Sequence, residues 1–92
     1  MISRSKIDNF LWEVEKVLMK RYGVDAAQRD MSTLYWYINT GRACVEFLHL
    51  LIKAKPFMVA RRLHNGGSDE EIIKRIKALI GFDDVEKSIL MI

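Results

Sequence analysis

Hydrophobic residues recur at helical spacing along most of the chain, and this pattern predicts an all-α protein. In the most apolar stretch, residues 42–53, the hydrophobic side chains would cover roughly 220° of a helix at about 100° per residue. Its polar residues would share the remaining strip: Arg42, Glu46, His49 and Lys53. A helix this apolar needs neighbours on several sides. We therefore expect one compact domain, residues 1–92, of four to six helices packed around a central apolar helix at residues 42–53.

The N-terminal segment predicts a long first helix. Ser3 and Ser5 are both suited to the N-cap position. Apolar residues from Ile7 to Tyr22 then recur on one helical face. Gly23 comes directly after the basic end of this pattern, as is typical of a helix C-terminus.

The next segment, residues 25–40, is also helical in pattern. Asp25 and Gln28 are suited to the start of a helix. Ser32-Thr33 could restart the helix, so the sequence leaves open whether this segment forms one helix or two. We expect Thr40 to cap the central helix that follows.

The second half of the chain carries strong boundary signals. Pro56 either interrupts the central helix or begins the next one. Asn65-Gly66-Gly67 predicts a stop. Ser68 and Glu71 form a capping box that begins another helix, which Gly81 should end. Asp83 is suited to capping a last short helix.

Composition and charge narrow the class of protein. Of the 92 residues, 50% are hydrophobic, and 15 basic against 12 acidic residues give a net charge of +3, a mild bias. The single cysteine, Cys44, rules out an internal disulfide and favours a reducing compartment. The chain shows no signal-peptide pattern and no apolar run near the ~20 residues of a membrane span. We expect a cytoplasmic protein that does not enter a membrane.

Candidate catalytic chemistry is weak. Glu46 and His49 form a single E-x-x-H pair, whereas di-iron bundles need two such pairs and further carboxylates. Cys44 and His49 lack a third, orienting residue. Gly66-Gly67 has neither the spacing nor the lysine of a phosphate-binding loop. We therefore predict a protein that is not an enzyme, with no catalytic residues, metal or cofactor.

Basic residues concentrate between residues 53 and 77, where seven of them stand against three acidic ones. The possible contacts for nucleic acid or an acidic partner are Lys53, Lys55, Arg61, Arg62, Lys74 and Lys77. The last third also resembles a helix-turn-helix, with the Ser68–Ile72 opening and a turn at residues 79–82. However, its first helix is about a turn too long, and residues 84–92 are acidic and apolar, which suits a DNA groove poorly.

Several aromatic and methionine residues fall off the inward-facing stripes. These predicted protein-interface residues are Trp12, Met19, Tyr35, Trp36, Leu90 and Met91. Their residue types are enriched at interfaces. We therefore predict a small protein-binding adaptor, inhibitor or regulator that self-associates and binds another protein, with an acidic surface as the favoured target. By analogy, small non-catalytic proteins of this kind often serve phages or mobile elements. The alternative is a nucleic-acid-binding regulator that uses residues 53–77.

Overall fold

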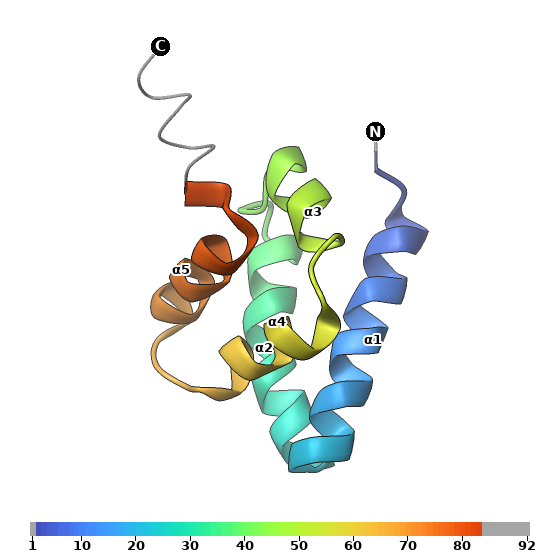
Figure 1. Ribbon diagram of the computed structural model, residues 1–92, viewed down its shortest axis with the longest axis vertical. Helices are drawn as coiled ribbons and strands as arrows, with labels where there is room; N and C mark the ends of the chain where they lie inside the picture. The colour runs from blue at the N-terminus through green and yellow to red at the C-terminus, as the bar shows by residue number, and fades with distance from the viewer. Residues whose placement is uncertain (1, 84–92) are drawn as a thin grey trace.

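The computed structural model of the protein describes residues 2–83, which form five α-helices (Figure 1). In chain order these are α1 (Arg4–Tyr22), α2 (Val24–Asn39), α3 (Val45–Leu51), α4 (Pro56–His64) and α5 (Asp69–Ile80). The predicted all-α class and the predicted number of helices are confirmed.

Helices α1 and α2 form an antiparallel hairpin (Figure 1). The Ser3 hydroxyl accepts a hydrogen bond from the backbone N–H of Lys6, so Ser3 is the N-cap. Gly23 separates the two helices at φ 95°, a backbone conformation that residues with a Cβ rarely adopt. Its N–H donates to the carbonyl of Met19. Residues 24–39 form one continuous helix, which decides between the two alternatives that the sequence left open.

Helix α4 packs against α1 and α2, and α5 packs against α4 and α2. Pro56 occupies the first turn of α4, where its missing N–H costs no hydrogen bond. Ser68 and Glu71 form the predicted capping box at the start of α5. Gly81, in the left-handed conformation, ends that helix as predicted.

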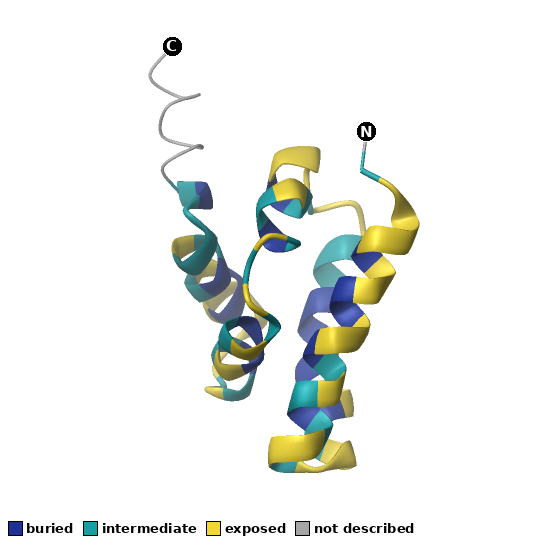
Figure 2. Ribbon diagram, turned by 45° about the vertical axis from the view of Figure 1, so that its right-hand side comes forward, coloured by how far each residue is buried: buried dark blue, intermediate teal, exposed yellow. Residues whose placement is uncertain are grey.

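Each helix turns its buried face towards one shared core (Figure 2). The side chains with the largest volume among the fully buried ones come from all five helices: Leu18 of α1, Met31 and Leu34 of α2, Phe47 and Leu51 of α3, Leu63 of α4 and Ile76 of α5. Exposed residues lie on the outer faces, so the amphipathic pattern of the sequence corresponds to the observed packing.

The predicted central helix at residues 42–53 is corrected by the structure. Helix α3 has only seven residues and lies at one end of the molecule (Figure 1). Phe47 and Leu51 are fully buried, but Val45 is 49% exposed and Cys44 is exposed. A turn on each side shortens the helix. In the first, the N–H groups of residues 42 and 43 donate to the carbonyl of Tyr37, and the second follows residue 51. The helices that make most of the core are α1, α2, α4 and α5.

The predicted capping role of Thr40 is also wrong. Thr40 ends α2 instead, where its hydroxyl donates to the carbonyl of Trp36. Cys44 occupies the N-cap position of α3 and makes no side-chain capping bond. The last short helix predicted after Asp83 lies outside the described residues.

Candidate functional site

An apolar groove of about 350 Å³ lies where α3, α4 and α5 meet. Helix α3 contributes Leu50, α4 contributes Met58, and α5 contributes Leu79 and Ile80. The loop between α3 and α4 supplies the remaining lining residues: Lys53, Ala54 and Lys55. We call this the lysine-rimmed groove.

The loop conformation places the two lysines at the groove. The N–H of Lys53 donates to the carbonyl of Leu50, and the N–H of Ala54 donates to the carbonyl of Leu51, which makes a tight turn after α3. Lys55 is the N-cap residue of α4, and Pro56 then begins that helix. Pro56 fixes its own φ and favours an extended conformation at Lys55. The backbone at this part of the groove rim is therefore restrained by the proline.

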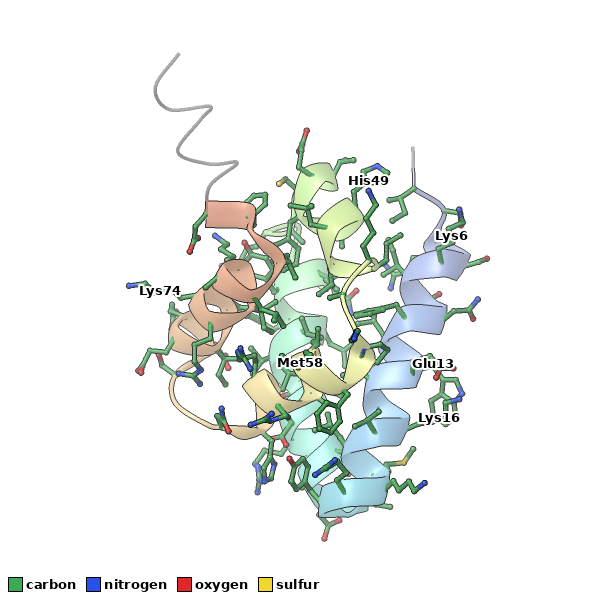
Figure 3. The ribbon with its side chains drawn as sticks, viewed as in Figure 1. Lys6, Glu13, Lys16, His49, Met58 and Lys74 are labelled. Carbon is green, nitrogen blue, oxygen red and sulfur yellow. The ribbon has the colours of Figure 1, made fainter. Side chains whose placement is uncertain are left out.

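The groove has a one-sided charge. Lys53 and Lys55 are both exposed, and among residues 2–83 no acidic residue lines the groove. The ion pairs found among residues 2–83 include neither lysine. The arrangement therefore offers apolar contact inside and unpaired positive charge at the edge. Met58 of α4 projects on the side that faces the viewer in Figure 3.

A second groove, of about 320 Å³, lies between α2 and α5. Its apolar lining consists of Trp36, Tyr37 and Ile73. Its charged lining is mixed: Glu70, Lys74, Lys77 and Asp83. Lys74 projects outward from α5 in Figure 3. The mixed signs leave this groove without the charge preference that marks the lysine-rimmed groove.

The predicted interface residues fall into three groups. Trp12 is 51% exposed and Tyr35 is 38% exposed, on the neighbouring helices α1 and α2. Met19 and Trp36 are half-buried against the core. Leu90 and Met91 lie outside the described residues.

Tyr35 is linked to α1 by its hydroxyl group, which donates to Oε1 of Glu15 at 3.1 Å. Partial burial raises the pKa of Tyr35, and the hydrogen bond to Glu15 and that carboxylate's negative charge raise it further. Tyr35 is therefore an amphipathic residue with one fixed polar contact and an accessible ring edge.

The predicted basic residues line different grooves. Lys53 and Lys55 belong to the lysine-rimmed groove, while Lys74 and Lys77 line the α2–α5 groove. Arg61 lies over the ring of Phe57 instead. Arg62, on α4, is half-buried. Nucleic-acid binding by residues 53–77 therefore stays a prediction, with its lysines divided between two grooves.

Several lining residues were missed by sequence reasoning. The sequence pattern places Leu79 and Ile80 in a helix-turn-helix-like turn and gives Met58 no role, so it does not indicate that the three residues line one groove. A third groove, of about 370 Å³ between α1 and α4, is lined by Val17, Lys20, Arg21 and Phe57. The adjacent cations Lys20 and Arg21 are a signal in the sequence that the predicted sites leave out.

The candidate metal and catalytic residues do not converge. Cys44, Glu46 and His49 are all exposed, with Cys44 at the N-cap of α3 and the other two within that helix. Figure 3 labels His49 on α3. Within residues 2–83 there is no group of three or more His, Cys, Asp or Glu residues that could hold a metal ion. In the same part of the chain, no helix is both long enough and apolar enough to cross a bilayer.

Comparison of the chain with protein-family models, curated proteins and solved structures gives no match.

Proposed function

We propose that the protein is a non-catalytic binding module that holds an acidic, amphipathic segment of a partner protein in the lysine-rimmed groove. The observation that carries this proposal is the combination of an apolar lining with two exposed, unpaired lysines at the rim. In this role the protein acts as an adaptor, inhibitor or regulator in the cytoplasm. The exposed free thiol of Cys44 suits a reducing compartment.

The size and chemistry of the groove support this occupant. A volume of about 350 Å³ accommodates a few apolar side chains, as in the recognition of a helix that lays one face into a groove. Met58 adds an unbranched, adaptable side chain, a common feature of protein-binding surfaces. Lys53 and Lys55 would attract carboxylates on the partner and fix its orientation.

A second surface supports self-association. Trp12 and Tyr35 are exposed aromatic side chains on the neighbouring helices α1 and α2, and neither lines the lysine-rimmed groove on α3, α4 and α5. Aromatic residues of this type provide the dominant anchors of protein interfaces. As part of the same proposal, a second copy of the chain covers these two side chains.

A titration followed by nuclear magnetic resonance tests the docking groove. The probe is a synthetic helical peptide with leucine at positions i, i+3, i+4 and i+7 and glutamate on the flanking positions. We expect the amide resonances of the groove residues to shift most. The double variant Lys53→Glu/Lys55→Glu should weaken binding at least tenfold, because like charges at the rim then repel the peptide.

The matched control reverses two exposed lysines elsewhere, Lys6→Glu/Lys74→Glu, and changes the net charge by the same amount. It should weaken binding far less, because neither residue lines the groove. Equal losses in the two double variants, or resonance shifts centred on another surface, would contradict the proposal.

A further inference from the structure

A cluster of cations surrounds the aromatic ring of Phe57 at the third groove, between α1 and α4: Lys20 and Arg21 line the groove with Phe57, and Arg61 lies beside the ring. The guanidinium carbon of Arg21 lies 4.6 Å from the centroid of the Phe57 ring, and that of Arg61 lies 5.8 Å from it. Phe57 is 37% exposed. Guanidinium groups at this distance from an aromatic ring are attracted to its negative face. Arg21 and Arg61 are therefore held beside a flat apolar surface that solvent reaches.

The cluster has no internal counter-charge. Lys20 lines the same groove, and the ion pairs found in the described part of the chain include none of its three cations. Of the residues that the structure describes, no acidic one lines this groove. Every charged group in the cluster is thus a hydrogen-bond donor, so the site is complementary to an anion with several acceptor oxygens.

We propose that this α1–α4 site binds single-stranded nucleic acid, with Phe57 and the guanidinium planes of Arg21 and Arg61 as the stacking surface. Single-strand sites combine cations that contact phosphates with aromatic and guanidinium planes that stack on bases. A groove of about 370 Å³ provides space for one base and its sugar. Lys20 and the edges of the two guanidinium groups would donate to the flanking phosphates.

Planarity favours nucleic acid over an acidic protein at this site. A glutamate-rich segment needs positive charge only, which lysine supplies without an aromatic neighbour. Here the guanidinium carbons of two arginines lie 4.6 and 5.8 Å from the centroid of one ring, and planar groups of both kinds match the flat faces of bases. The site is separate from the lysine-rimmed groove, so this inference does not depend on the proposed function.

Fluorescence anisotropy with a labelled single-stranded oligouridine of about twelve nucleotides tests the site. We expect saturable binding at low salt. If three cations contact phosphates, the logarithm of the binding constant should fall with the logarithm of salt concentration at a slope of about −2. Unlabelled poly-glutamate should compete much less well than unlabelled oligouridine.

Variants separate stacking from charge. Phe57→Leu keeps an apolar side chain but removes the plane, and we expect it to weaken binding about tenfold. Arg61→Gln should weaken binding several-fold and make the salt slope about 0.7 less steep. The control Lys6→Gln removes an equal charge near the far end of α1, roughly 20 Å from Lys20, and should change little. Circular dichroism checks that each variant is folded.

Three results would overturn the inference. The first is no change in anisotropy at low salt. The second is an Arg61→Gln variant that loses no more affinity than Lys6→Gln. The third is poly-glutamate that displaces the probe as effectively as oligouridine, which would show a generic anion surface. Because Arg61 has an exposed side chain outside the core, its variant remains informative if Phe57→Leu does not fold.

Discussion

Nδ1 of His64 lies 2.7 Å from Oδ2 of Asp30, a carboxylate that is only 7% exposed. The imidazole ring also stacks on Tyr22, with ring centroids 3.6 Å apart. Nε of Arg29 is 3.5 Å from the other oxygen of Asp30. A buried carboxylate is costly unless partners offset its lost hydration. His64, at the end of α4, therefore joins α4 to both helices of the hairpin.

Replacing His64 with alanine should lower the free energy of unfolding by about 1.5–3 kcal/mol, the usual contribution of a hydrogen bond to a charged group. The loss arises because Asp30 remains buried with one fewer partner. Urea unfolding followed by circular dichroism measures it. His49→Ala is the matched control, since His49 is exposed on α3 and should change stability by less than about 0.5 kcal/mol.

A double-mutant cycle shows whether the pair itself is responsible. We expect His64→Ala and Asp30→Asn to be non-additive by about 0.5 kcal/mol or more, as is usual for residues in contact. If the two losses simply add, the effect of His64→Ala comes from its stacking on Tyr22.

The Tyr35–Glu15 hydrogen bond gives a prediction in alkaline solution. Because the fold raises the pKa of Tyr35, the folded state retains the phenol proton more strongly than the unfolded state does. This contribution to stability is complete below the ordinary tyrosine pKa of about 10 and is lost as the pH rises through the higher pKa of the folded state. We expect Tyr35→Phe to lose less stability than the parent protein over that window.

The same contact can be tested by direct titration. Glu15→Gln removes the negative charge near the phenol and should lower the pKa of Tyr35, read as tyrosinate absorbance after subtraction of the Tyr35→Phe spectrum. Glu13→Gln is the control, because Glu13 pairs with Lys16 and makes no contact with Tyr35. A pKa of Tyr35 that is equal in both variants would refute the assigned role of Glu15.

Helix boundaries were largely predictable because local chemistry sets them. Gly23, Pro56, Ser68 and Gly81 each act through their own backbone or nearest turn, and each lies at the predicted boundary. The central position of residues 42–53 was not predictable. A helical projection of residues 42–53 shows which side chains favour burial. It does not show where the helix ends, which the loop conformations before residue 44 and after residue 51 decide.

The grooves were less predictable than the helices. Phe57 and Arg21 are 36 positions apart in the sequence, and only the packing of α4 against α1 brings them together. Likewise, Met58 meets Leu79 at a groove because α4 and α5 are neighbours. A sequence pattern assigns each residue to a helical face, but it does not determine which faces meet.

Leu51 and Leu48 of α3 test the correction to the predicted central helix, because the sequence predicts burial on several sides and the structure fully buries only Leu51 of the two. Leu51→Ala should lower the free energy of unfolding by about 2–5 kcal/mol, because Leu51 is fully buried and its truncation leaves a cavity. Leu48→Ala should have a smaller effect, because Leu48 is only half-buried. Thermal and urea unfolding measure both. Equal losses would mean that α3 is enclosed on more sides than the structure shows.

Trp12 offers the sharpest test of self-association. Trp12→Ala should leave the free energy of unfolding within about 0.5 kcal/mol, because half of the side chain is already in solvent. The mass measured by light scattering should fall if a second copy packs on this ring. Val45→Ala is the control: Val45 is 49% exposed on α3, a different helix from that of Trp12, and should leave the mass unchanged. A Trp12 variant that unfolds would place this residue in the core, and one that keeps the parent mass would exclude Trp12 from the contact between copies. Only a fall in mass with stability preserved assigns Trp12 to contact between copies, since burial within the chain and burial between chains change these two measurements in different ways.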